Sequence, residues 1–181
     1  MKYIAGVDEV GRGCLAGPVI AAAVVLKTNI PGLADSKMLS KKKREELSTT
    51  IMQNSYFSFG YASVNEIDSI NILQASLLAM KRAILNLSVE PGKILVDGIH
   101  KPDLDIDTQT IIGGDSVVDE ISAASIIAKV YRDNLMMQFD KKYPDFYFSS
   151  HKGYGTKLHK AAIKKYGITP IHRKTFKGVI A

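Results

Sequence analysis

The sequence predicts an α/β fold, and three observations support this prediction. Short apolar runs typical of buried strands recur along the chain. Segments with helical periodicity separate several of these runs. The composition is that of an ordinary globular protein, with 46% hydrophobic and 23% charged residues. At 181 residues the chain can bury a sizeable core, so we expect a single domain over residues 1–181.

The first predicted strand leads into the most informative stretch, residues 4–18 (IAGVDEVGRGCLAGP). Asp8 and Glu9 follow an apolar start and precede a glycine-rich turn. Neighbouring side chains on a regular strand point to opposite faces, so the two carboxylates can share a site only if the strand kinks or ends there. Two like charges at one point are costly unless a cation, a proton or water offsets them. This context favours a metal site over a solvated strand end.

The glycines of this turn also allow a second interpretation, a dinucleotide-binding loop. The third glycine of GRGCLAG comes one residue late for that motif, and two carboxylates would repel a pyrophosphate. Cys14 is the only cysteine, which excludes an intrachain disulfide. We expect it to be a small filler of the loop and not a nucleophile.

The next elements follow from apolar runs and a capping signal. Residues 19–26 (VIAAAVVL) predict a buried strand. Ser40 is a good N-cap for a helix over residues 41–54, and we expect Leu47 and Ile51 to face the core while the basic KKKRE segment faces solvent.

Residues 56–64 alternate aromatic and small side chains and predict a third strand. Ser63 with Glu66 resembles a capping box for a short turn, and Asn71 with Gln74 marks another helix start. The helix that follows carries a stripe of core residues at helical spacing and should stop at Pro91-Gly92: Leu73, Leu77, Met80, Ile84 and Leu87.

Residues 93–97 and 108–112 predict two further strands, and residues 119–143 and 156–166 predict helices. The first of these strands ends on an aspartate, Asp97.

Ligands in open α/β sheets gather beyond the carboxyl ends of strands, so Asp97 is a candidate to meet Asp8 and Glu9. The alternative is an ordinary Asp-Gly turn. Asp115 precedes the helix over 119–143, where it could cap that helix or turn toward a metal. Hard oxygen ligands of this kind suit Mg²⁺ or Mn²⁺. Two such ions about 4 Å apart can activate water and stabilise the leaving oxygen in phosphodiester hydrolysis.

The charge balance is compatible with a polyanionic partner. Lys and Arg number 24 against 18 Asp and Glu, a formal charge of +6. Nucleic acid is therefore a candidate partner. The sequence has neither a signal-peptide pattern nor a membrane-spanning apolar stretch, so we expect a cytoplasmic protein without membrane contact, and a monomer.

Six motifs, in order along the chain, resemble those of one family, the type 2 ribonucleases H (ribonuclease HII). They are AGVDEVGRG (5–13), DSKMLS (35–40), EIDSINIL (66–73), LVDG (95–98), GGDS followed by EISAASIIAKVYRD (113–133), and HKGYGT (151–156). One motif alone is modest support, but six in register make chance agreement improbable.

The resemblance implies a ribonuclease H-like fold: a five-stranded mixed sheet flanked by helices, with additional C-terminal helices. It implies endonucleolytic cleavage of the RNA strand of RNA–DNA hybrids, including cleavage 5′ of single ribonucleotides in duplex DNA, that leaves 3′-hydroxyl and 5′-phosphate ends. By motif position, Asp8, Glu9, Asp97 and Asp115 would be the catalytic, metal-binding acids.

The resemblance also implies residues that read the substrate. Gly11, Arg12 and Gly13 would contact the ribose 2′-hydroxyl, which distinguishes RNA from DNA. Tyr154 would stack on the sugar of the next nucleotide and select an RNA-to-DNA junction. Lys37 would contact phosphate, and three further cations are candidates for the same role or for plain surface charge: Lys152, Arg173 and Lys174.

The histidines and Cys14 receive lesser roles. We expect His100 and His159 to be solvated and His151 to orient the loop of Tyr154. Cys14 stands where the family often has proline, a loop position that should not alter the chemistry.

Three other protein classes share some of these sequence features. The type 3 ribonucleases H carry an extra N-terminal domain and lack the arginine between the two loop glycines, so Arg12 favours type 2. A catalytically silent nucleic-acid-binding domain of the same fold is the main alternative, and four acids near phosphate disfavour it. A phosphatase for small molecules would fit the acids but neither the basic excess nor Tyr154.

Overall fold

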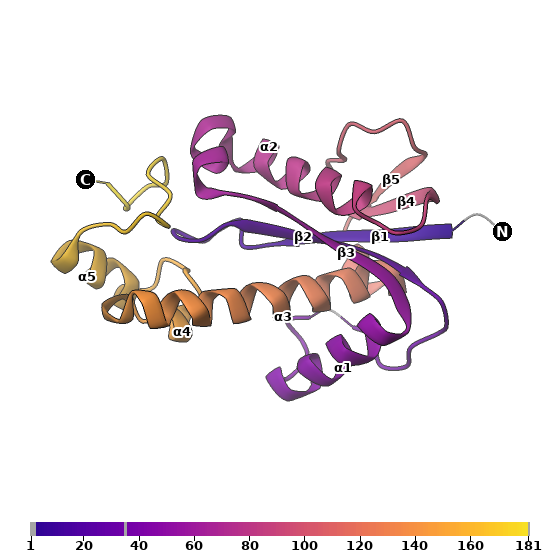
Figure 1. Ribbon diagram of the computed structural model, residues 1–181, viewed down its shortest axis with the longest axis horizontal. Coiled ribbons are helices and arrows are strands. Elements are labelled where there is room, and N and C mark those ends of the chain that lie inside the picture. The colour runs from indigo at the N-terminus through magenta and orange to yellow at the C-terminus, as the bar shows by residue number, and fades with distance from the viewer. Residues whose placement is uncertain (1–2, 35, 181) are drawn as a thin grey trace.

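A computed structural model describes residues 3–34 and 36–180, so Asp35 of the DSKMLS motif lies outside the described residues. In this part of the chain, five strands form one sheet in the order β3-β2-β1-β4-β5 (Figure 1). Strand β2 is antiparallel to both of its neighbours, β1 and β3, whereas β1, β4 and β5 are parallel, which confirms the predicted mixed sheet. The strands are β1 (Tyr3–Val10), β2 (Val19–Leu26), β3 (Ser55–Ala62), β4 (Pro91–Asp97) and β5 (Thr108–Ile111).

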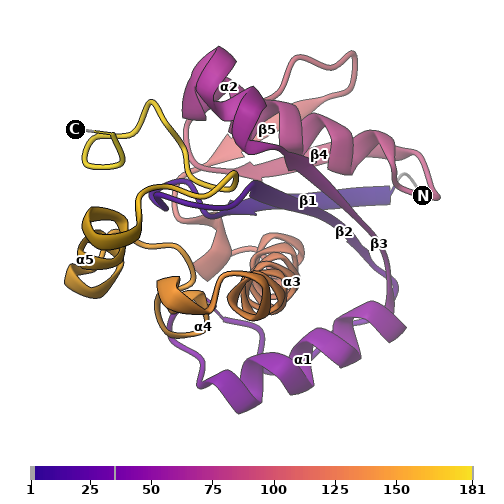
Figure 2. The same cartoon turned by 60° about the vertical axis from the view of Figure 1, so that its left-hand side comes forward.

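Helices cover both faces of this sheet. Helix α2 packs on one face, and α1 and α3 pack on the other, each over its own apolar core (Figure 2). Two short helices gather at the end of the molecule where α3 finishes, as predicted for the C-terminal part (Figure 1). The helices are α1 (Lys41–Gln53), α2 (Val64–Leu85), α3 (Asp119–Lys142), α4 (Phe148–His151) and α5 (Lys157–Tyr166), with 3-10 turns η1 (Gly114–Ser116) and η2 (Pro144–Phe146).

Helix α1 begins as its sequence predicts. The Ser40 side chain accepts a hydrogen bond from the Lys43 amide, and Leu47 and Ile51 are buried. The lysines at the start of the helix are exposed.

Helix α2 contains both of the predicted starts. Ser63 and Glu66 form a reciprocal capping box at its N-terminus. Asn71 interrupts the helix with a φ of 68°, and its side-chain oxygen accepts hydrogen bonds from the amides of Leu73 at 2.9 Å and Gln74 at 3.1 Å. The predicted stop at Pro91 is wrong: the helix ends at Leu85, and Pro91 begins β4.

Strand β3 alternates as predicted, but its small side chains are the ones that pack under α2. Ser58, Gly60 and Ala62 are buried, whereas Tyr61 is exposed. A Cβ on Gly60 would lie 2.1 Å from the carbonyl oxygen of Ala79 in α2. The small residues therefore permit close contact between strand and helix.

Helix α3 approaches β1 just as closely. A Cβ on Gly6 would lie 2.1 Å from the Glu120 carbonyl carbon, so only glycine fits there. The first turns of α3 are rich in small buried residues such as Ala123, Ala124 and Ser125. This contact fixes α3 against the strand that carries Asp8 and Glu9.

Candidate active site

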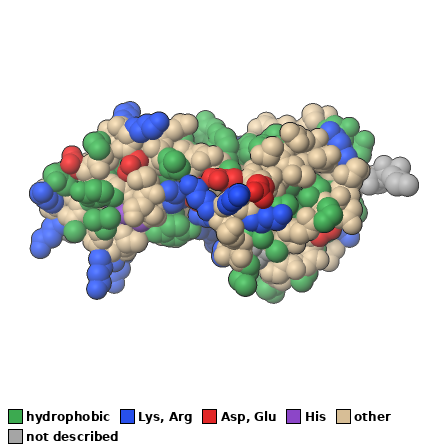
Figure 3. Space-filling view, turned by 90° about the horizontal axis from the view of Figure 1, so that it is seen from below, with side chains coloured by type: hydrophobic (Ala, Val, Ile, Leu, Met, Phe, Trp, Pro, Cys, Tyr) green, Lys and Arg blue, Asp and Glu red, His purple; other side chains and the backbone are tan. Residues whose placement is uncertain are grey.

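The strand pairing brings the predicted acids to one end of the sheet. In the parallel pair of β1 and β4, Val7 lies opposite Val96, and the next residues along the two strands are Asp8 and Asp97. Asp97 is also paired with Ile111, the last residue of β5. Asp115 follows in η1, immediately beyond β5. The space-filling view shows acidic side chains gathered at the waist of the molecule beside Lys and Arg side chains (Figure 3).

Asp8 and Glu9 lie on opposite faces of the sheet, because Asp8 pairs with Ala22 of the core under α1 and α3, and Glu9 pairs with Ala21 of the core under α2. Strand β1 ends at Val10, close behind the pair as predicted, but the two acids still alternate in direction. The Ser125 hydroxyl of α3 is a hydrogen-bond partner of Asp8. Glu9 instead lines a cavity of about 240 Å³ that Asp97 and several α2 residues also line.

The electrostatics of these acids confirm that they interact. Burial raises the pKa of Asp8 well above its ordinary value, and the charges of Glu9 and Asp97 raise it further. Burial also raises the pKa of Glu9, opposed by Arg12, whose Nη1 lies 3.0 Å from Glu9 Oε1. The Asp97 charge adds to the increase at Glu9. The site therefore holds more negative charge than its surroundings offset.

Hydrogen bonds and one cation hold the remaining two acids. The Gly114 amide donates to Asp97 Oδ1 at 2.7 Å. Asp115 is buried, with Lys37 Nζ 3.7 Å from its Oδ2, and the Ser122 hydroxyl donates to its backbone carbonyl. The alternative that Asp115 caps α3 is wrong, because Val118 is the N-cap and no side chain caps that end.

The donor set suits a hard divalent cation. Its side-chain donors are all carboxylate oxygens, and a bound cation would offset the burial, and the charge of Asp97, that raise the pKa values of Asp8 and Glu9. As the side chains stand, the described residues contain no group of three or more His, Cys, Asp or Glu arranged to hold a metal ion. The four acids therefore fit the chemistry of Mg²⁺ or Mn²⁺ without forming a closed cage.

The glycine loop lies next to the acids and beside the loop of Tyr154. Gly11 has a φ of 94°, Gly13 is exposed, and the Arg12 side chain reaches back to Glu9. Cys14 is buried and forms a β-bridge with Tyr154, which is 42% exposed. Burial raises the pKa of the Cys14 thiol, as expected for a loop filler and not for a nucleophile. The structure thus brings together both segments that were expected to read the substrate.

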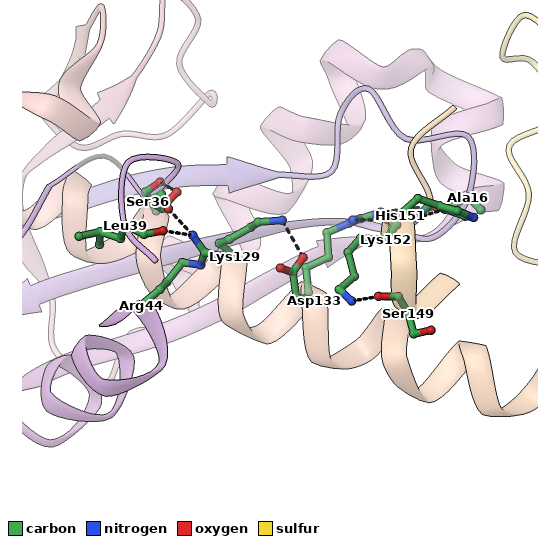
Figure 4. A network of polar contacts seen from close by, with 12 residues as sticks. Ala16, Ser36, Leu39, Arg44, Lys129, Asp133, Ser149, His151 and Lys152 are labelled. Carbon is green, nitrogen blue, oxygen red and sulfur yellow. Dashed lines mark hydrogen bonds and ion pairs between the residues drawn. The ribbon is translucent and has the colours of Figure 1, made fainter. Parts of the chain in front are cut away.

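The candidate phosphate contacts fall into two groups. Lys37 and Lys174 are exposed, and Lys152 is half-buried with its ammonium bonded to the Ser149 carbonyl (Figure 4). Arg173 is fully buried, so the interpretation of Arg173 as a phosphate contact or a surface charge is wrong. Its guanidinium is occupied by three backbone carbonyls of the glycine loop.

His100 and His159, which were both expected in solvent, differ in their exposure. His100 is exposed, as expected, but the expectation that His159 is solvated is wrong, because it is fully buried against His151 and His172. His151 accepts a hydrogen bond from the Gly153 amide at 3.2 Å, one residue from Tyr154. The HKGYGT motif contains His151, but nothing in the sequence around His172 indicates this cluster.

A comparison with protein families identifies the family of this chain. The family model described as Ribonuclease HII matches residues 5–179. The chain belongs to the ribonuclease HII family. Its members are endoribonucleases that act on RNA–DNA hybrids and depend on divalent metal ions. The family that the six sequence motifs predict is thereby confirmed.

Individual relatives agree with this assignment. A ribonuclease HII of Coxiella burnetii is 59% identical over 97% of this chain and 89% of its own length. The crystal structure of ribonuclease H2 from Pyrococcus horikoshii OT3 has a TM-score of 0.80 at 29% identity, covering 99% of this chain and 95% of the other. Bst-RNase HIII in complex with Mn²⁺ has a TM-score of 0.70 at 18% identity over 98% of this chain and 68% of the other, which shows a shared fold.

The described residues contain no helix that is long and apolar enough to cross a membrane.

Proposed function

We propose that Asp8, Glu9, Asp97 and Asp115 hold one or two Mg²⁺ or Mn²⁺ ions, and that this ribonuclease HII cuts hybrids and also cuts 5′ of single ribonucleotides in duplex DNA. The observation that carries the proposal is the raised pKa of Asp8, which burial and the charges of Glu9 and Asp97 cause. Bound ions of this kind lower the pKa of water and stabilise a leaving oxygen, giving 3′-hydroxyl and 5′-phosphate ends.

The protein's own residues would orient the acids. The Glu9 amide donates to Asp8 Oδ1 at 2.7 Å, and the Gly114 amide to Asp97 Oδ1 at the same distance. Each bond directs one oxygen of its carboxylate. A divalent ion bound to Asp115 would replace Lys37 as the positive charge beside that carboxylate. The Lys37 ammonium would then turn toward a substrate phosphate.

The two exposed loops would supply selectivity for ribose. Gly11, Arg12 and Gly13 would contact the 2′-hydroxyl, and Tyr154 would stack on the following sugar. Their adjacency supports this assignment, because the loops are joined at the bridge between Cys14 and Tyr154. Lys129 lies with its ammonium 6.0 Å from the centre of the Tyr154 ring and would add a positive charge beside the backbone of the substrate.

A catalytically silent binding module of the same fold is not favoured. Such a module would gain nothing from buried carboxylates beside a polyanion, because they repel phosphate. The excess negative charge at Asp8 is costly without a cation and is explained by metal-dependent hydrolysis.

Replacement of Asp8 tests the proposal. Asp8→Asn removes a metal-binding charge and keeps a hydrogen-bond acceptor for the Glu9 amide, so cleavage of a hybrid should be abolished while hybrid binding persists. Asp103→Asn, at an exposed acid outside the site, is the matched control and should cut normally. Retained cleavage by Asp8→Asn would remove Asp8 from the catalytic role.

A further inference from the structure

Two fully buried arginines lie under the substrate-reading loops. Arg132 comes from α3 and Arg173 from the C-terminal segment, and both are 0% exposed. Neither forms an ion pair with a carboxylate of the described residues. A buried guanidinium without a counter-ion is costly, so its bonds must be supplied by other oriented groups. Here those groups are backbone carbonyls.

Arg173 binds three carbonyls of the glycine loop. Its Nη2 donates to the Gly11 carbonyl at 2.6 Å, Nη1 to Arg12 at 2.8 Å, and Nε to Gly17 at 2.9 Å. The planar fork of the guanidinium fixes the directions of all three carbonyls at once, which a lysine cannot do.

The directions of these carbonyls determine where the amides point. The described chain has no cis peptide bond, and in a trans peptide the carbonyl and the following N–H point in opposite directions. The carbonyls of Gly11 and Arg12 point inward to Arg173, so the amides of Arg12 and Gly13 point away from it. Neither amide donates a hydrogen bond to an acceptor among the described residues. Successive free amides of this kind form a site for an anion or another oxygen acceptor.

Arg132 links this loop to the loop of Tyr154. Its Nη2 donates to the Ala16 carbonyl at 3.0 Å and its Nε to Pro18 at 3.1 Å, while Nη1 donates to Lys152 at 2.9 Å. The loop passes so near that a Cβ on Gly11 would lie 2.2 Å from Arg132 Nε. This side chain therefore adds to the backbone bridge between Cys14 and Tyr154 in fixing the spacing of the two substrate-reading segments.

We propose that Arg173 and Arg132 are positioning residues for ribose recognition. Arg173 holds the Gly11 and Arg12 carbonyls inward so that the Arg12 and Gly13 amides meet the substrate. Arg132 holds the same loop against the loop of Tyr154. Neither arginine touches the substrate itself. The inference rests on the proposed function, in which this loop reads the 2′-hydroxyl. It accounts for two buried positive charges that form no ion pair with a carboxylate in residues 3–34 and 36–180.

Binding without cleavage tests this inference. The affinity of the protein for two duplexes that differ in a single 2′-hydroxyl is measured in the presence of a chelator, by fluorescence anisotropy. Arg173→Lys keeps the charge but loses the fork, and Arg132→Lys does the same at the second arginine. In each variant we expect the ratio of the affinity for the ribonucleotide duplex to that for the all-DNA duplex to fall at least fivefold. The affinity for the all-DNA duplex should stay unchanged.

Arg82→Lys is the matched control. Arg82 also makes two side-chain bonds, to the Tyr61 carbonyl and to Glu66, but on α2 at the surface. This variant should keep the full preference. Thermal melting and circular dichroism establish whether each variant is folded.

The outcomes separate this inference from the proposed function. A preference that survives in both folded lysine variants overturns the inference alone. Failure of both lysine variants to fold also overturns it, in favour of a purely structural role. A wild-type protein with no preference overturns the ribose reading by the glycine loop, and the inference with it.

Discussion

The imidazoles of His159 and His172 lie 3.0 Å apart, from Nε2 to Nε2. Only one pair of tautomers satisfies all the hydrogen bonds of the two rings. The Thr169 amide donates to His172 Nδ1 at 2.9 Å, so His172 carries its proton on Nε2. His159 Nε2 must then accept, which leaves the proton of His159 on Nδ1, 2.9 Å from the Tyr154 carbonyl. Two neutral imidazoles thus connect Thr169 to the loop of Tyr154.

Loss of this connection should impair junction recognition more than hybrid cleavage. His159→Ala removes the donor to the Tyr154 carbonyl, a buried bond worth about 1 kcal/mol, or about fivefold in rate. We expect a decrease of that size for a duplex with one ribonucleotide, measured relative to a continuous hybrid. His159→Asn retains a donor near the position of Nδ1 and should recover part of the loss. Equal losses on both substrates would contradict the role given to this bond.

The same pair predicts how stability depends on pH. Burial lowers the pKa of both His159 and His172 from 6.5 to about 4. Between these values the unfolded chain binds more protons than the folded protein, so the free energy of unfolding falls as the pH falls through this window and is restored above its upper end. Melting temperatures of the wild type should decrease more steeply over this range than those of His159→Asn. Identical slopes would show that His159 is not held neutral.

The acidic site should cost stability when no metal ion is present. Asp8→Asn removes a buried charge that Glu9 and Asp97 oppose, so the variant should be more stable by about 1 kcal/mol, or about 2–4 °C in melting temperature. Addition of Mg²⁺ or Mn²⁺ should raise the melting temperature of the wild type, and should raise that of the variant by less. A less stable variant in the presence of chelator would contradict the repulsion inferred at this site.

The break in α2 gives a prediction that concerns stability alone. Asn71 combines a positive φ with two side-chain bonds to the following amides. Asn71→Ala loses the cap and keeps the backbone strain, so it should destabilise the protein by about 2 kcal/mol in urea unfolding. Asn71→Gly tolerates the backbone and should cost less. The reverse order would show that the positive φ costs less than the conformational entropy that glycine adds to the unfolded chain.

Local signals in the sequence predicted the elements well. Ser40, the Ser63 and Glu66 pair and Asn71 each begin a helix through contacts within a few residues, so their spacing is visible in the sequence. Asp97 was found for a similar reason, because an acid at the end of a short apolar strand has a defined place in an open sheet. The family resemblance added the single five-stranded mixed sheet, which local patterns do not contain.

The buried polar residues could not be predicted in this way. Arg173 bonds to Gly11 across 162 positions, and Arg132 to Ala16 across 116. A charged side chain is expected at the surface unless partners are known, and those partners are backbone carbonyls without a sequence signature. His159 was expected in solvent for the same reason, since its partner His172 belongs to another segment.

The orientation of Asp8 and Glu9 was predictable only in part. Strand alternation correctly implied opposite faces, but the position of Asp97 beside Asp8 depends on the register of β1 against β4. Asp115 was open between a cap and a metal ligand, and the position of Val118 as the N-cap of α3 decided against the cap.

Cleavage of a labelled DNA duplex that contains one ribonucleotide tests the central claim most directly. The duplex is incubated with the protein and Mg²⁺ or Mn²⁺, beside a chelator control and an all-DNA duplex. We predict metal-dependent cutting immediately 5′ of the ribonucleotide, with a 3′-hydroxyl and a 5′-phosphate at the new ends and the all-DNA duplex intact. A duplex that is bound but stays whole in both metals would contradict the account.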